Sequence, residues 1–217
     1  QRVMDLFHLG QGNRIGFAPV NSIEQMLEDP HLKERGFLVE VEQPGLGKIT
    51  LPGPVARLSN SYWSVRKPAP PLGGHQGATF EQQRGSQIKS GPKRSLPLEG
   101  VTVADFTWVW AGPFCTMHLA HLGAEVIKVE SRQAPDLGRR LPIFSAQHEA
   151  SVDTNGYFNQ LGQGKKSITL DLSTLEGQKI AKQIATTCDL VVSNYATGVM
   201  EKFGLGYEEL AKERSDV

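Results

Sequence analysis

Short apolar runs alternate with segments of helical periodicity in the second half of the chain. Residues 101–106 form an apolar, β-branched run that is typical of a buried parallel strand, and residues 125–130 are the next predicted strand. Between them we expect a helix over residues 114–122, with Pro113 at its first position and Gly123 in a left-handed C-cap. This pattern predicts a βαβ unit, whose ligand site normally lies at the carboxyl ends of the strands.

The same alternation continues toward the end of the chain. Residues 167–172 and 190–194 are predicted strands, and the helix between them is predicted to begin with a capping box of Ser173 and Glu176. Residues 131–157 are expected to form a long irregular connection. Strands that alternate with helices of about a dozen residues indicate a parallel, Rossmann-like sheet.

The first 75 residues follow a different pattern. Residues 14–20 are a predicted strand, and Ser22 with Gln25 fits a capping box at the start of a short helix. Residues 37–42 and 48–51 alternate as the strands of an antiparallel hairpin do, around a turn that contains Pro and Gly. The predicted fold class is therefore α/β: a Rossmann-like parallel sheet in the C-terminal half, preceded by part of a smaller α+β domain with an antiparallel hairpin.

A stretch of different composition separates these two regions. Residues 76–97 are rich in Gly, Gln, Ser and Lys and have little periodicity, which is typical of a linker. The predicted organisation is a first domain over residues 1–75, a linker over residues 76–97 and a second domain over residues 98–217.

Charge and hydropathy exclude several classes of partner. Lys plus Arg and Asp plus Glu number 23 each, so the formal net charge is zero and nothing indicates nucleic-acid binding. The pairs Lys165-Lys166 and Arg139-Arg140 are interpreted as solvated surface. No apolar run approaches the roughly 20 residues that cross a bilayer, and no signal peptide opens the chain. We therefore expect a cytoplasmic protein without a membrane partner.

Cysteines and histidines suggest no redox or metal chemistry. Cys115 and Cys188 give neither a disulfide framework nor a zinc pattern, and both are predicted to be buried. The 6 histidines lack the spacing of metal ligands, so no metal site is expected.

Four motifs between residue 98 and about residue 210 carry a resemblance to a known family. They read V-A-D-F-T-W-V-W-A-G-P followed by L-G-A-E-V-I-K-V-E, then K-K-S-I-T-L-D-L, C-D-L-V-V-S-N-Y and G-V-M-E-K-F-G-L-G-Y-E-E-L. In this order and spacing they are similar to the opening of the class III CoA-transferases, the CaiB/BaiF family. That family includes formyl-CoA and carnitine-CoA transferases and α-methylacyl-CoA racemase.

The first region resembles the far C-terminal part of the same family. The similar stretches are F-A-P-V-N-S-I-E-Q-M-L, P-G-L-G-K-I-T-L-P-G-P and R-K-P-A-P-P-L-G-G-H. A family tail thus precedes a family head, which we interpret as the junction of a tandem fusion. Residues 1–75 would end a first copy, and residues 98–217 would be the truncated, CoA-binding start of a second. Circular permutation is the alternative.

The resemblance also implies where coenzyme A binds, at the ends of the parallel strands. Three positions depart from the family pattern, because Ser131 and Lys202 stand where relatives often carry Arg and Gly164 stands where they carry Asn. The implied cofactor-binding residues are Trp110, Ala111, Ser131, Arg132, Leu170, Asp171, Leu172, Ser173, Asn194, Tyr195, Ala196 and Lys202.

The implied activity is movement of CoA from an acyl-CoA donor to a carboxylic acid acceptor through an aspartyl nucleophile. That aspartate would lie beyond residue 217, so no catalytic residue is assigned here and this segment alone is expected to be inactive. Acyl-CoA and coenzyme A would be substrates, with no permanently bound cofactor. Relatives form interlocked dimers, so the resemblance implies a homodimer or an internal pseudo-dimer.

Three other functions stay open at this point. An isomerase similar to α-methylacyl-CoA racemase would share the fold and the CoA site, and a degenerate copy would bind CoA without catalysis. A nicotinamide-dependent enzyme would use Glu130 to bind a ribose hydroxyl, but the turn before the helix lacks the G-x-G-x-x-G that a pyrophosphate requires. Glu130 is equally compatible with a surface or ion-paired carboxylate.

Overall fold

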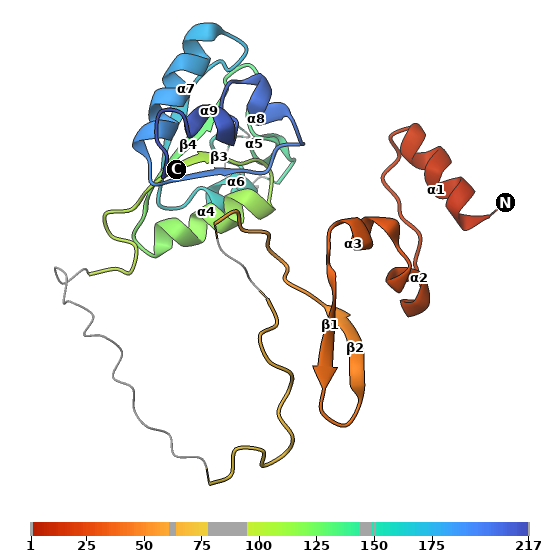
Figure 1. Ribbon diagram of the computed structural model, residues 1–217. Coiled ribbons are helices and arrows are strands. Elements are labelled where there is room, and N and C mark those ends of the chain that lie inside the picture. The colour runs from red at the N-terminus through yellow and green to blue at the C-terminus, as the bar shows by residue number, and fades with distance from the viewer. Residues whose placement is uncertain (1, 61–63, 78–94, 144–148, 150, 217) are drawn as a thin grey trace. The chain divides into compact units, whose positions relative to one another are not determined.

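A computed structural model of the chain describes residues 2–60, 64–77, 95–143, 149 and 151–216 (Figure 1). It divides into two compact units, Gln1–Arg84 and Gly85–Val217. Most of the predicted linker over residues 76–97 lies outside the described residues. No helix in the described parts of the chain has the length and apolar character that a membrane span requires.

The second unit is built on a four-stranded parallel sheet with the strand order β5-β4-β3-β6. Its strands are β3 (Thr102–Phe106), β4 (Glu125–Glu130), β5 (Lys165–Thr169) and β6 (Leu190–Ser193). The predicted Rossmann-like parallel sheet is confirmed. Strand β5 begins and ends earlier than predicted. It ends early because the chain turns away from the sheet at Asp171, whose carboxylate accepts a hydrogen bond from Ser173 N at 3.0 Å.

Two helices cover opposite faces of this sheet (Figure 1). They are α4 (Ala111–His121) and α7 (Leu175–Thr187). Ala104 and Phe106 pack with Ala181 and Ala185 of α7, whereas Val103 and Val126 pack on the α4 side. Successive strand residues point to opposite faces, so β3 contributes to two cores and is buried on both sides.

The start of α4 differs from the prediction. The helix begins at Ala111 after the N-cap Trp110, so Pro113 is the third helical residue instead of the first. Proline is tolerated there because the N–H groups of a first helical turn have no partner within the helix. Gly123, with a φ of +104°, confirms the predicted left-handed C-cap.

The capping of α7 was also predicted one residue too early. Thr174, and not Ser173, is the N-cap, and its side chain accepts a hydrogen bond from Gly177 N at 3.1 Å. The Ser173 hydroxyl instead donates to Asp171 Oδ1 at 2.6 Å, within the turn before the helix. Shorter helices complete the unit: α5 (Leu137–Arg140), α6 (Gly156–Leu161), α8 (Val199–Lys202) and α9 (Tyr207–Leu210). The predicted irregular connection over residues 131–157 thus contains α5 and the start of α6.

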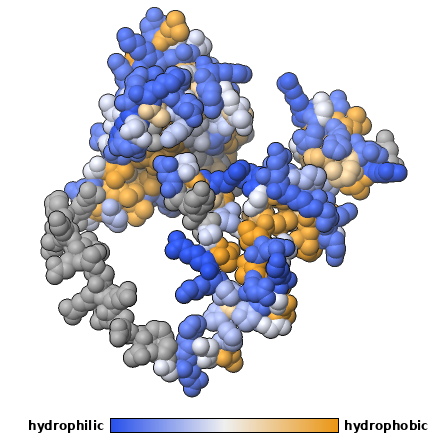
Figure 2. All heavy atoms as spheres, in the orientation of Figure 1, coloured by the Kyte–Doolittle hydropathy of each residue, from blue (hydrophilic) through white to orange (hydrophobic). Residues whose placement is uncertain are grey.

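The outward face of α4 carries apolar side chains. Phe114 is exposed there, as are the capping residues Trp110 and Leu122 at its two ends, and Figure 2 shows apolar side chains gathered at this part of the second unit. Cys115 is exposed on the same helix, so its predicted burial is wrong, whereas Cys188 is buried as predicted. Residues 114 and 115 both follow the buried Pro113, and the helical rotation turns them away from the sheet.

The first unit consists of short helices followed by a hairpin. The helices are α1 (Val3–Gly12), α2 (Ile23–Leu27) and α3 (Pro30–Glu34), and the antiparallel strands are β1 (Leu38–Gln43) and β2 (Gly47–Pro52). The hairpin and the capping box of Ser22 and Gln25 are confirmed. The strand predicted over residues 14–20 is wrong: none of the described residues pairs with this stretch as a strand, and Arg14 has a φ of +58°.

Candidate functional site

An apolar pocket of about 520 Å³ lies at the carboxyl ends of the parallel strands. This is the edge of an open α/β sheet at which ligands usually bind. Aromatic and aliphatic side chains form most of its wall, with a few polar groups at the rim. The lining residues are Trp108, Val129, Glu130, Ser131, Gln133, Ala134, Leu170, Asp171, Leu172, Ser173, Tyr195, Val199 and Phe203.

Three aromatic rings form one side of this apolar pocket. The ring centroids of Trp108 and Tyr195 are 6.0 Å apart at an interplanar angle of 67°, and those of Tyr195 and Phe203 are 6.4 Å apart at 75°. Burial raises the pKa of Tyr195 to about 12, so its hydroxyl stays neutral at physiological pH. The wall therefore offers flat apolar surfaces to a ligand ring, together with an uncharged hydroxyl.

Asp171 supplies a fixed negative charge at the rim. Its Oδ1 accepts hydrogen bonds from the amide and the hydroxyl of Ser173, and these bonds lower the pKa of the Asp171 carboxyl. An anionic ligand group is therefore disfavoured on this side of the pocket.

A polar pocket of about 430 Å³ adjoins the apolar one and shares Glu130 and Ser131 with it. Arg139 crosses this polar pocket: its Nε and Nη2 donate to the two carboxylate oxygens of Glu130 at 2.8 Å each, and its Nη1 donates to Asp153 at 2.9 Å. The hydrogen bonds to Glu130 raise the pKa of Arg139. Glu130 is thus an ion-paired carboxylate, and its oxygens are engaged instead of being directed at a ribose.

Arg132 lines the same polar pocket and is exposed. It also borders a smaller cavity together with Thr169, Leu170 and Asp171. No hydrogen bond or ion pair engages Arg132 in the part of the chain that the structure describes. Arg132 is therefore the cation that a ligand phosphate near the apolar pocket could reach.

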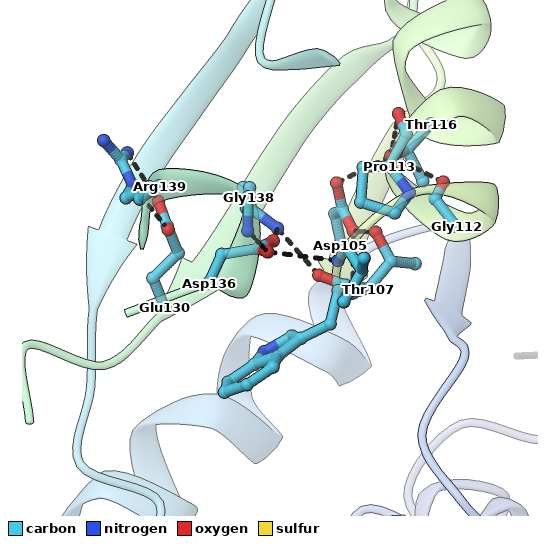
Figure 3. A network of polar contacts seen from close by, with 12 residues as sticks. Asp105, Thr107, Gly112, Pro113, Thr116, Glu130, Asp136, Gly138 and Arg139 are labelled. Carbon is cyan, nitrogen blue, oxygen red and sulfur yellow. Dashed lines mark hydrogen bonds and ion pairs between the residues drawn. The ribbon is translucent and has the colours of Figure 1, made fainter. Parts of the chain in front are cut away.

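Two ion pairs are buried beneath the turn between β3 and α4. Figure 3 labels their carboxylate members, Asp105 and Asp136. Lys165 Nζ lies 3.1 Å from Asp105 Oδ2, with side-chain exposures of 3% and 0%, and also donates to Thr116 Oγ1 at 2.7 Å. Lys128 Nζ lies 3.1 Å from Asp136 Oδ2, and both of these side chains are 2% exposed. Buried charges of this kind are sustained by their pairing and by their hydrogen bonds.

These ion pairs lower the pKa of Asp105. Burial alone would raise it, but Lys128 and Lys165 and the hydroxyl groups of Thr107 and Thr116 favour the charged carboxylate more strongly. The pKa of Lys165 is lowered as well, because burial outweighs the attraction of Asp105. Asp105 is therefore ionised well below neutral pH.

The interpretation of Lys165 and Arg139 as solvated residues is wrong. The Arg139 side chain is only 14% exposed, and Lys165 points under the first turn of α4, where it also donates to Pro113 O at 3.0 Å. Sequence reasoning also missed Lys128 and Asp136. One usable signal was a charged residue in the middle of a buried strand, as at Asp105 and Lys128.

The predicted CoA-binding residues separate into two groups. Six of them line the apolar pocket: Ser131, Leu170, Asp171, Leu172, Ser173 and Tyr195. The others lie outside its lining: Arg132 borders the polar pocket, Trp110 is 66% exposed at the N-cap of α4, and Ala111, Asn194, Ala196 and Lys202 line neither pocket. Among the residues that were not predicted, Trp108, Val199 and Phe203 belong to the quoted motifs and could have been found there.

Asn194 has a different role from a ligand contact in this structure. Its Oδ1 accepts from Trp108 N at 2.7 Å, and its Nδ2 donates to Trp108 O at 2.9 Å. Both polar ends of its side chain are therefore engaged by the turn that carries Trp108. No group of three or more His, Cys, Asp or Glu side chains is placed to hold a metal within the described residues.

Comparisons with known proteins agree with this architecture. The family model described as CoA-transferase family III matches residues 1–76 and 98–217. The chain is 42% identical over 120 residues to the succinyl-CoA:mesaconate CoA-transferase of Haloarcula hispanica, a match that covers 55% of this chain and 30% of that protein. It is 45% identical over 118 residues to the succinyl-CoA:glutarate CoA-transferase of Mus musculus, covering 54% of this chain and 26% of that protein.

The solved structures include similar folds. The crystal structure of Rv3272 from M. tuberculosis in its orthorhombic form superposes with a TM-score of 0.50 at 34% sequence identity, covering 58% of this chain and 32% of that one. The chain thus spans about a third or less of the length of the relatives that it matches.

Proposed function

The chain belongs to CoA-transferase family III, and on that premise we propose that residues 98–217 bind coenzyme A in the apolar pocket at the strand ends. The whole protein would move CoA from an acyl-CoA donor to a carboxylic acid acceptor. The two relatives named above are both CoA-transferases, which favours transfer over a racemase-like isomerisation.

The observation that carries this proposal is the aromatic wall of the apolar pocket. Adenine is a flat ring that gains most from a slot between apolar and aromatic side chains. Trp108, Tyr195 and Phe203 line the pocket together with Leu170 and Leu172, so the lining offers the apolar and aromatic surface that such a ring needs. We expect the adenine of coenzyme A to occupy this space.

The phosphates of coenzyme A would lie on the side of Arg132. Asp171 carries a negative charge at the rim, while Arg139 is already paired with Glu130 and Asp153. Arg132 is an exposed cation that borders both the polar pocket and the small cavity beside Leu170. An arginine can bind a phosphate with two parallel hydrogen bonds.

The covalent steps would take place on an aspartate beyond residue 217. Its carboxylate would attack the thioester carbonyl, the C–S bond would break, and the CoA thiolate would leave a mixed anhydride behind. The thiolate would then attack the aspartyl carbonyl, releasing the donor acid and forming an aspartyl thioester. The acceptor carboxylate would reverse both steps, so the residues described here bind and orient CoA and supply no nucleophile.

The two matched segments support the proposed domain organisation. Residues 1–76 and 98–217 both match the same family model, with the unmatched stretch between them where the linker is predicted. We propose that the chain spans the junction of a tandem fusion, with the C-terminal part of one copy before the linker and the CoA-binding part of the next copy after it. Such a fusion could fold as an internal pseudo-dimer.

A competitive titration tests the proposed binding. The 217-residue chain is titrated with coenzyme A by calorimetry, alone and in the presence of excess NAD. We expect saturable binding of coenzyme A that NAD does not displace, and no CoA-transfer turnover by this chain. Displacement by NAD, or the absence of any CoA binding, would contradict the proposal.

A further inference from the structure

Val109 has a backbone conformation that β-branched residues rarely adopt. Its φ is +66°, in the left-handed region, where the Cβ atom crowds the following carbonyl group. Apart from glycines, only Arg14 shares a positive φ among the described residues. Such an outlier persists where the surrounding contacts over-determine it, and these positions cluster at functional sites.

Contacts with three side chains fix the backbone on both sides of Trp108. In the peptide group that joins Thr107 to Trp108, the carbonyl accepts from Lys128 Nζ at 2.7 Å and the N–H donates to Asn194 at 2.7 Å. In the next peptide group, the carbonyl accepts from Asn194 at 2.9 Å and the N–H of Val109 donates to Asp136 Oδ1 at 3.0 Å. All four polar atoms of these two peptide groups are therefore bonded.

Asp136 is the member of this set that bonds Val109 itself (Figure 3). Its Oδ1 also accepts from Gly138 N at 2.8 Å, and its Oδ2 faces Lys128 Nζ at 3.1 Å. The Asp136 side chain is 2% exposed and does not line the apolar pocket. It can therefore act on a ligand only through the residues that it holds.

Asp136 also connects two segments that line the apolar pocket. Gln133 and Ala134, a few residues before it in the chain, belong to the lining, and so does Trp108, next to Val109. The Asp136 carboxylate caps α5, directly after the first segment, and bonds the turn that carries Trp108.

We propose that Asp136 is a positioning residue of the coenzyme A pocket. With Lys128 behind it, Asp136 holds Val109 in the left-handed conformation and so fixes the Trp108 ring as a pocket wall. The identity of the ligand rests on the proposed function; the mechanical role of Asp136 does not.

Two conservative variants separate position from charge. D136N keeps an acceptor oxygen in place for the amides of Val109 and Gly138 but removes the charge, whereas D136E keeps the charge beside Lys128 and moves the carboxylate by one methylene. We expect calorimetry on the full chain to show CoA affinity about tenfold or more below the wild type for D136E. The loss should be smaller for D136N, which keeps an acceptor for the amides of Val109 and Gly138 but leaves the buried Lys128 without its counter-charge. Affinity of D136E within roughly threefold of the wild type would overturn the proposal.

D189N serves as the matched control. Asp189 likewise accepts a backbone amide of the β3 region, from Thr102 N at 2.9 Å, but at the opposite end of the strand from the pocket. Its replacement by Asn is expected to leave CoA affinity unchanged. A loss equal to that of D136E would show that general weakening of the sheet, and not positioning, reduces binding.

Amide hydrogen exchange on the wild-type chain tests the same role without any variant or ligand. We expect the Val109 amide to exchange as slowly as those of β3, and exchange at the rate of an exposed loop would overturn the proposal. If the wild type binds no coenzyme A, the proposed function fails, while this exchange measurement still decides the role of Asp136.

Discussion

Asn194 and Trp108 exchange two hydrogen bonds, at 2.7 Å from Trp108 N to Asn194 Oδ1 and at 2.9 Å from Asn194 Nδ2 to Trp108 O. The residue that follows β6 thereby holds the turn that follows β3, its neighbour in the sheet. An amide side chain can satisfy an adjacent donor and acceptor in this way because it carries both groups. One wall of the apolar pocket thus depends on a contact between distant parts of the chain.

Replacing Asn194 by alanine is expected to loosen this wall. N194A removes both bonds to Trp108 and should lower the free energy of unfolding by about 1–2 kcal/mol, with CoA affinity falling about tenfold. Urea denaturation and calorimetry measure the two effects. The control N159A removes an exposed side-chain amide that donates to Asp153 O and lies outside the lining of the apolar pocket. CoA affinity should not change in this variant. Unchanged CoA affinity in N194A would contradict the positioning of Trp108 by Asn194.

The buried ion pair of Lys165 and Asp105 should be far more sensitive than a surface pair. K165M leaves Asp105 charged and buried without its closest cation and is expected to destabilise the chain by about 3–5 kcal/mol. The neighbouring K166M removes an exposed pair with Glu125 and is expected to cost at most about 1 kcal/mol. If urea denaturation gave the same loss of unfolding free energy for K165M and K166M, the burial of Lys165 would have no special energetic role.

The lowered pKa of Asp105 predicts the direction of one pH effect. Because the folded-state pKa lies below the ordinary value of 3.8, the stabilisation by Asp105 is fully present above that value and is lost as pH falls through the folded-state pKa. Stability curves of the wild type and D105N should therefore converge as the pH falls below about 4. A stability difference that stays constant from pH 7 to pH 2 would contradict this assignment.

The close approach of α4 to the turn predicts an effect at Gly112. A Cβ atom there would lie 2.4 Å from Thr107 Cβ and 2.9 Å from Asn194 Cγ. G112A should therefore push the turn away from Asn194 and lower stability by about 1–3 kcal/mol. In G156A, at the start of α6, the nearest atom would be 3.7 Å away, so no such clash is expected. Thermal unfolding measures both effects: the melting temperature should fall in G112A and should change less in G156A.

Local sequence signals predicted the elements of the fold well. Short runs rich in β-branched residues identified β3, β4 and β6, because such side chains are favoured in strands. The same signal failed over residues 14–20, because a strand exists only where a partner can share its hydrogen bonds. The α7 cap was placed one residue too early, at Ser173, because Ser173 and Thr174 are both good N-cap residues and the sequence alone does not decide between them.

The polar part of the site was harder to predict, because it depends on contacts between distant segments. Lys165 lies next to a second lysine and looks solvated in the sequence, yet the register of β5 places it beneath α4. Asp136 bonds Val109, 27 residues earlier in the chain. Val109 belongs to a quoted motif and Asp136 to none, so nothing in the sequence suggests the contact. The resemblance pointed to residues at the strand ends, and the division of these residues between the pocket lining and its support required the structure.

We propose that the pocket lined by Trp108, Tyr195 and Phe203 receives coenzyme A. A crystal structure of this chain with coenzyme A bound tests this placement. We expect electron density for the adenine against these three rings, with phosphate density within reach of Arg132. Coenzyme A bound elsewhere, with this pocket empty, would contradict it.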